Sequence, residues 1–301
     1  MVGRGWEPGP YDPPENPGLK LLDKRLLVVS GKGGVGKSAV AAALAQLATR
    51  HGKRVLVIDM GESAGLSAHL GVSGLEFTPR EVRPDLHAMR LVRSDSLIEY
   101  LTLQLSIRGL SRLGGLARAF DALATAAPAV REIISIGKVL WEVREQKWDL
   151  VIADAPPTGQ IGSYLRAPLS IAELVPTGRI QRQAAWMGDT LSNPDVTNLV
   201  LVNLAEELPT TETNQTLEWL ERNDLVPVPT IVTNRLFKPL AVAAQGKGPV
   251  KDAALHHQAV YAEQQYWLEH RTPDLTLPYL FGLLTPNEVA ARLSEELEAH
   301  L

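Results

Sequence analysis

The chain has 301 residues, of which 45% are hydrophobic and 21% are charged, and its formal net charge is −4. This size and composition indicate a globular protein with one large α/β domain or at most two domains, and the negative charge argues against a nucleic-acid partner held mainly by electrostatic attraction. The lack of cysteine excludes disulfides and thiolate metal sites, and no apolar run reaches membrane-spanning length, so we expect a cytoplasmic protein that does not insert directly into a membrane.

Residues 1–20 are rich in glycine and proline, and we expect them to form a flexible arm. Residues 21–301 are expected to form a single domain in which apolar strand-like runs alternate with helical stretches. The predicted strands are Arg25–Ser30, Arg54–Asp59, Leu86–Val92, Leu150–Asp154, Thr197–Asn203, Pro229–Asn234 and Leu275–Pro278. Several of these runs are continuously apolar, which is typical of strands covered on both faces.

The predicted helices are Lys37–His51, Ser96–Ile107, Ala129–Gln146, Thr210–Arg222, Lys251–Glu269 and Asn287–Leu301. Strands that alternate with helices favour an α/β fold with a doubly wound, mostly parallel sheet of about seven strands and helices on both faces. In such folds the ligand lies at the carboxyl ends of the strands.

A phosphate-binding loop is the most specific motif in the chain. Residues 31–38 (Gly-Lys-Gly-Gly-Val-Gly-Lys-Ser) follow an apolar run and precede an alanine-rich helical stretch, which is the context that this motif requires. Glycines let backbone N–H groups approach phosphate oxygens, and the start of the helix adds partial positive charge. The residues expected to bind the nucleotide here are Gly33, Gly34, Val35, Gly36, Lys37, Ser38 and Ala39.

Two strand-end carboxylates are candidates for the chemistry beside this loop. Asp154 ends an apolar strand and precedes Ala-Pro-Pro-Thr-Gly, so it is the candidate Walker B aspartate. We expect Ser38 and Asp154 to hold Mg²⁺. Asp59 ends the second predicted strand and is either a catalytic carboxylate or a cap for the segment that follows.

Lys32 and the segments around residues 154–160 and 207–213 make the chain similar to a known family. A lysine directly after the first glycine of the loop is the signature lysine of the deviant Walker A ATPases. Together with Asp-Ala-Pro-Pro-Thr-Gly-Gln and Glu-Leu-Pro-Thr-Thr-Glu-Thr, it resembles the ArsA family, which contains arsenical-pump ATPases and the guided-entry ATPases that target tail-anchored membrane proteins. The resemblance runs from about Lys24 to the C-terminus and includes the segment Leu86–Tyr100.

The resemblance implies a dimeric, ATP-hydrolysing switch that handles a protein client. Lys32 would reach across the dimer to the phosphates of the partner, so that ATP closes the dimer. Lys32 and Lys37, with Asp59 or Glu62, would assist the attack of water on the γ-phosphate. The resemblance also implies that Asn234 contacts adenine, and that the loop after Pro278 covers the base.

Several positions depart from the family pattern. Gly61 occupies the place of a water-activating aspartate, and the adjacent Glu62 is the candidate substitute. Gln160 stands where the family often has histidine. The lack of cysteine excludes the arsenite and zinc-bridging sites, and only about thirty residues separate Pro168 from Thr197, too few for a long methionine-rich client insert.

Two alternatives stay open from the sequence. Because of Gly61, the chain is either a homodimeric ATPase or a hydrolysis-poor subunit that pairs with a paralogous ATPase. A positioning ATPase of the MinD/ParA type is disfavoured because the C-terminal helical stretch is acidic, whereas membrane-surface helices are usually basic. The apolar segment near residues 96–146, including a stripe at Ile133, Ile136, Leu140 and Val143, is either core or a contact surface for a client or partner.

Overall fold

A computed structural model describes residues 17–61, 65–92, 94–96, 99, 128–240 and 248–300. Glu62, the arm up to residue 16 and most of the predicted helix Ser96–Ile107 lie outside these ranges. Among the described helices, none combines the length and the hydrophobicity that a membrane-spanning helix needs.

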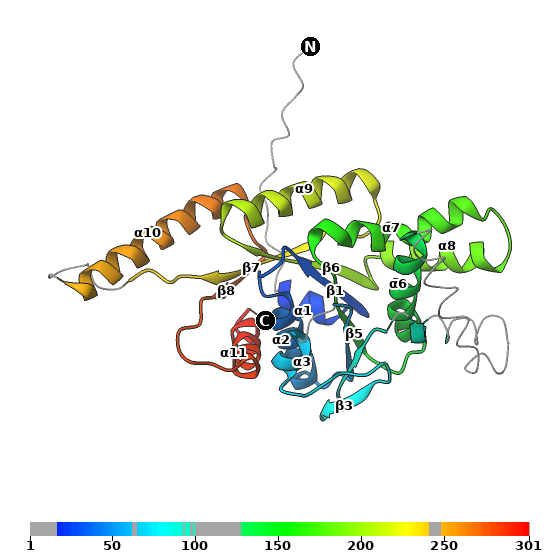
Figure 1. Cartoon of the computed structure of the whole chain (residues 1–301), viewed down its shortest axis with the longest axis horizontal. Coiled ribbons are helices and arrows are strands. Elements are labelled where there is room, and N and C mark those ends of the chain that lie inside the picture. The colour runs from blue at the N-terminus through cyan, green and yellow to red at the C-terminus, as the bar shows by residue number, and fades with distance from the viewer. Residues whose placement is uncertain are drawn as a thin grey trace, which may run out of the picture.

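The described residues form one eight-stranded sheet with the strand order β3-β4-β2-β5-β1-β6-β7-β8 (Figure 1). Each neighbouring pair is parallel except β3 and β4, which are antiparallel. The strands are β1 (Leu26–Gly31), β2 (Val55–Asp59), β3 (Arg80–Arg83), β4 (Leu86–Arg90), β5 (Leu150–Asp154), β6 (Thr197–Leu204), β7 (Thr230–Leu236) and β8 (Leu275–Pro278).

The predicted fold class is confirmed, and all seven predicted strands are present. The additional strand, β3, has the sequence Arg-Glu-Val-Arg and lies at the sheet edge with no buried residue. An edge strand buries little surface, so it needs no apolar run, and the sequence pattern therefore gave no sign of it.

The described helices are α1 (Pro17–Leu22), α2 (Lys37–Arg50), α3 (Gly65–Leu70), α6 (Pro128–Arg144), α7 (Thr158–Leu174), α8 (Arg179–Ser192), α9 (Glu207–Asn223), α10 (Pro249–His270) and α11 (Pro286–Glu298). Four of them, α1, α3, α7 and α8, were not predicted. α1 begins at Pro17, so the last residues of the segment 1–20, which was expected to be a flexible arm, are helical. α7 follows two prolines and contains Pro168, Gly159 and Gly162, residues that lower helix propensity.

Helices lie on both sides of the sheet (Figure 1), and a buried cluster of side chains covers each of its two faces. Leu27 and Val29 of β1 belong to the cluster that contains α2 and α11, whereas Leu26 and Val28 belong to the cluster that contains α6, α7 and α8. This alternation is the two-residue period of a strand. By contrast, α10 extends away from the sheet, and its buried residue is Gln264.

The apolar stripe of α6 belongs to the core. Ile136, Leu140 and Val143 are buried in the second cluster, and Ile133 packs against it. Of the two interpretations left open for this stripe, the structure supports the core.

The packing of α11 on α2 gives a test of the fold. Leu293 is 2% exposed in the first cluster. We expect Leu293→Ala to lower the free energy of unfolding, measured with urea, by about 2–5 kcal/mol, because it leaves a cavity in the core. The neighbouring Arg292→Ala serves as control, because Arg292 is exposed and its ion pair with Glu295 lies on the surface of the same helix. It is expected to change the free energy of unfolding by less than about 0.5 kcal/mol. Equal effects of the two variants would contradict this packing.

Candidate functional site

The phosphate loop connects the end of β1 to the start of α2 and requires glycine for steric reasons. A Cβ atom at Gly31 would lie 2.1 Å from the Val202 carbonyl oxygen of the neighbouring strand β6. Gly36 has a φ of 97°, and a Cβ there would lie 2.5 Å from the Asn234 amide nitrogen. No side chain caps α2 at Gly36, so its first N–H groups remain available to an anion.

Gly33 and Gly34 lie on the open side of this loop. Both are exposed, and a Cβ atom at either would meet nothing within 4 Å. Val35 and Ala39 are buried on the opposite side, in the first core cluster. The loop is therefore anchored to the core on one side and open on the other, as a phosphate cradle requires.

Lys37 lies folded over the loop. Its ammonium group donates a hydrogen bond to the Lys32 carbonyl oxygen at 3.1 Å. Burial lowers the pKa of Lys37, and the nearby Asp154 carboxylate opposes this shift. A cation that is partly removed from water and carries one negative neighbour is suited to bind phosphate oxygens.

Asp154 ends β5 and is 6% exposed. Burial raises its pKa to about 6, and the nearby Asp59 acts in the same direction, whereas the hydrogen bond from Ser38 and the charge of Lys37 oppose the rise. A buried carboxylate hydrogen-bonded to a hydroxyl offers two hard oxygen ligands. These two ligands fit Mg²⁺, which is commonly held by one or two carboxylates together with substrate phosphates.

Asp59 lies directly beside Asp154, because the two residues are in register at the ends of β2 and β5. Its carboxylate accepts hydrogen bonds from Arg90 Nη2 at 2.9 Å, Arg90 Nε at 3.2 Å and the Gly61 N–H at 3.0 Å. Burial raises the pKa of Asp59, and Arg90 and Gly61 oppose the rise. Arg90, at the end of β4, was not predicted as a site residue, although its place at a strand end beside β2 is a signal that could have indicated it.

Lys32 forms an ion pair with Glu212 of α9. The second carboxylate oxygen of Glu212 accepts a hydrogen bond of 3.3 Å from Thr158, the first residue of α7. A further hydrogen bond, from the Ser30 hydroxyl to the Pro156 carbonyl oxygen at 2.6 Å, joins β1 to the segment before α7. Glu212 lies within the motif at residues 207–213, but the sequence alone assigned it no role.

Asn234 is 4% exposed and lies against the phosphate loop. Its amide group donates to the Val35 carbonyl oxygen at 2.9 Å, and its own carbonyl oxygen accepts from the Arg235 N–H. The residues that follow Asn234 are hydrogen-bonded to Gln264 of α10. Its side-chain amide donates to the Arg235 carbonyl oxygen at 3.0 Å and accepts from the Phe237 N–H at 2.8 Å.

An aromatic surface lies where β8 ends at Pro278. Tyr279 and Phe281 both contact Phe237, with ring centroids 4.8 and 5.7 Å apart, and Phe281 is 66% exposed. These rings lie at the same edge of the sheet as the phosphate loop.

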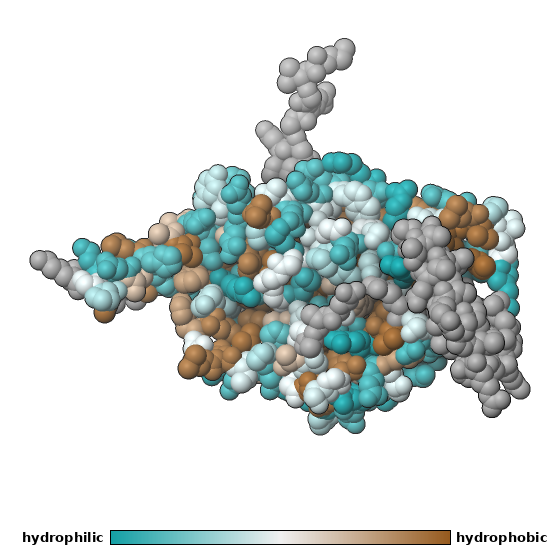
Figure 2. Space-filling view, viewed as in Figure 1, coloured by the Kyte–Doolittle hydropathy of each residue, from teal (hydrophilic) through white to brown (hydrophobic). Residues whose placement is uncertain are grey.

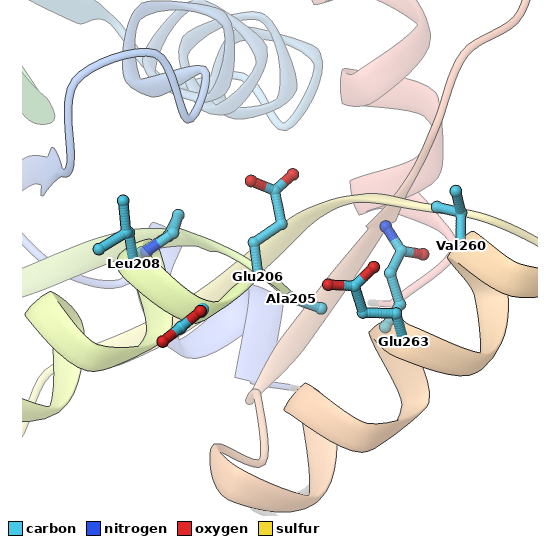
Figure 3. Close-up of a pocket in the computed structure, with 8 residues that line it drawn as sticks. Ala205, Glu206, Leu208, Val260 and Glu263 are labelled. Carbon is cyan, nitrogen blue, oxygen red and sulfur yellow. The ribbon is translucent and has the colours of Figure 1, made fainter.

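A cavity of about 420 Å³ lies between the start of α9 and α10 (Figure 3). Glu206 and Leu208 line it from the α9 side, and Val260 and Glu263 line it from α10. It follows the end of β6, which pairs with both β1 and β7.

The structure thus brings most of the predicted site residues to one edge of the sheet. Asp59 and Asp154 end β2 and β5, Lys32 lies in the loop after β1, and Lys37 and Ser38 begin α2. Asn234 and Pro278 lie at the ends of β7 and β8, and Glu62 falls outside the described residues.

Comparison with known proteins finds ATPases. The family described as "Anion-transporting ATPase" (ArsA) matches residues 24–183. The chain is 29% identical over 249 residues to ATPase BagA of Mycobacterium tuberculosis, covering 76% of this chain and 72% of the relative. It is 30% identical over 152 residues to ATPase GET3 of Podospora anserina, covering 49% of this chain and 45% of the relative, and 31% identical over 152 residues to ATPase get3 of Neurospora crassa, with the same coverage.

The raised pKa of Asp154 predicts a stability that depends on pH. Because the pKa of about 6 in the folded chain exceeds the ordinary value of 3.8, the folded state holds the proton more tightly and loses stability as the pH rises through 6. Asp154→Asn removes this loss. We therefore expect the substitution to be more favourable to stability at pH 7 than at pH 4. The change that it causes in the free energy of unfolding should be higher at pH 7 by about 2–3 kcal/mol, measured in EDTA without nucleotide. The exposed Asp189→Asn is the control; an equal effect of Asp154→Asn at both pH values would contradict the assignment.

Proposed function

The chain belongs to the ArsA family of anion-transporting ATPases, and from this premise we propose that it is a cytoplasmic, MgATP-binding, nucleotide-switched dimeric ATPase that handles a protein client. The observation that carries the proposal is the cluster at one sheet edge. An uncapped helix start, two lysines and two buried carboxylates lie around a loop that has no room for a Cβ atom at Gly31 or Gly36.

The proposed reaction is hydrolysis of the γ-phosphate. The oxygen of a water molecule attacks the γ-phosphorus, the bond to the oxygen that bridges the β- and γ-phosphates breaks, and ADP and phosphate are released. Lys37 neutralises charge on the transferred group, and Lys32 from a second copy of the chain adds a second cation. Ser38 and Asp154 would hold Mg²⁺, which would neutralise phosphate charge when bound.

The nucleoside would lie at the ends of β6, β7 and β8. Asn234 and the loop after Pro278 are proposed to contact the base, and the exposed faces of Tyr279 and Phe281 offer a stacking surface. The cavity between α9 and α10 adjoins this edge, and the carboxylates of Glu206 and Glu263 can accept hydrogen bonds from ribose hydroxyls.

A client surface is proposed at the far end of α7 and the start of α8. Leu169, Leu174 and Ile180 are exposed by 42%, 73% and 51%, and Figure 2 shows apolar surface in this region of the molecule. Since α7 starts at Thr158, four residues after Asp154, a change at the nucleotide can alter the position of this surface.

A second function is favoured by Gly61. The carboxylate beside it, Asp59, accepts hydrogen bonds from Arg90 and from the Gly61 N–H, and it is 1% exposed. Asp59 is therefore poorly placed to orient water. On this basis the chain is a nucleotide-binding subunit with little hydrolysis of its own, paired with a paralogous ATPase.

Steady-state ATP hydrolysis by the purified chain, beside Lys37→Ala and Gly61→Asp, distinguishes the two functions. We expect slow turnover that is lost in Lys37→Ala, and an increase of about tenfold or more in Gly61→Asp, because a positioned carboxylate contributes about 10²–10⁴ to proton transfer. Tight MgATP binding without turnover would favour the subunit role. Failure to bind MgATP at all would refute both functions.

A further inference from the structure

The ion pair between Lys32 and Glu212 has a consequence for the switch. The Lys32 ammonium group has three N–H donors, but its pairing with Glu212 holds the side chain against α9 of its own chain and offsets its charge. Both effects oppose contact with phosphates bound to a second chain. We propose that Glu212 is a positioning residue that holds Lys32 within its own subunit, and that a nucleotide in the second subunit must displace it. This inference rests on the proposed function, in which Lys32 acts across a dimer.

The geometry of Glu212 supports this role. Its two carboxylate oxygens join two separate parts of the site, because one pairs with Lys32 of the phosphate loop and the other accepts the hydrogen bond from Thr158 at the start of α7. Glu212 itself belongs to α9. One side chain therefore links the loops that follow β1, β5 and β6, all at the edge where the phosphates are expected.

The strength of the contact is suited to a reversible switch. The Lys32 and Glu212 side chains are 29% and 38% exposed, and partly exposed ion pairs contribute little to stability. A triphosphate carries several negative charges against the single charge of Glu212, so phosphates within reach of Lys32 compete effectively for it. Bound phosphates close to Thr158 would also repel the Glu212 carboxylate. Both effects release Lys32 when ATP arrives.

The first test is nucleotide-dependent dimerisation, measured by sedimentation across a titration of MgATP. We expect Glu212→Gln to lower the ATP concentration at half-dimerisation by roughly two- to fivefold, the range for losing a partly exposed pair. Glu218→Gln removes the same charge from the same helix, where Glu218 pairs with Arg222, and should match the wild type. In a Lys32→Ala background, Glu212→Gln should have no effect of its own.

The second test needs neither nucleotide nor dimer. Acetic anhydride labelling of the nucleotide-free chain, followed by mass spectrometry, reports how accessible the Lys32 amine is. We expect Lys32 to react several-fold faster in Glu212→Gln than in the wild type or in Glu218→Gln, with Lys147 as an internal reference that does not change.

The outcomes separate the inference from the function on which it rests. If the wild type dimerises with ATP but Glu212→Gln shifts neither the midpoint nor the labelling, the positioning role of Glu212 is wrong and the dimeric ATPase stands. If the wild type binds MgATP and stays monomeric, the dimeric function is refuted. A labelling increase in Glu212→Gln would then support only the ion pair, and the proposed role of Glu212 in controlling Lys32 across subunits would be refuted.

Discussion

Two carboxylates share one buried edge of the sheet, and the rest of the site is arranged around them. Register fixes Asp59 beside Asp154, since β2 and β5 are parallel neighbours. Burial raises the pKa of both carboxyl groups, and the charge of Asp59 raises that of Asp154 further. Different groups oppose the rise in pKa at each carboxyl group. Arg90 and the Gly61 N–H lower the pKa of Asp59, whereas Ser38 and Lys37 lower that of Asp154. Asp59 is thus the more fully paired of the two, and Asp154 is left as the carboxylate on which a divalent cation would have the larger effect.

The sequence predicted the parts of this arrangement that depend on local pattern. Continuous apolar runs predicted the strands, and the glycine-rich motif predicted the loop that connects β1 to α2. Strand-end carboxylates at Asp59 and Asp154 followed from the rule that parallel strands gather their carboxyl ends at one edge.

Contacts between distant segments could not be predicted in the same way. Arg90 is 31 residues from Asp59, and Glu212 is 180 residues from Lys32, so neither pairing leaves a local signature. α7 was missed because proline and glycine lower its intrinsic propensity, and its stability comes from tertiary packing, in which Gly162 allows close approach to Trp219. The resemblance assigned Asn234 to the base, and its hydrogen bond to the phosphate loop, 199 residues away in the sequence, had no local signal.

The hydrogen bond from the Ser30 hydroxyl to the Pro156 carbonyl oxygen limits how α7 can move. It ties the segment before α7 to the central strand β1, so that any tilt of α7 must pivot at its first residues. A helix of 17 residues is about 25 Å long, and each degree of tilt therefore moves its far end by about 0.4 Å while the pivot stays still. A tilt of α7 therefore moves its last residue, Leu174, the most, and Leu174 is an exposed apolar side chain.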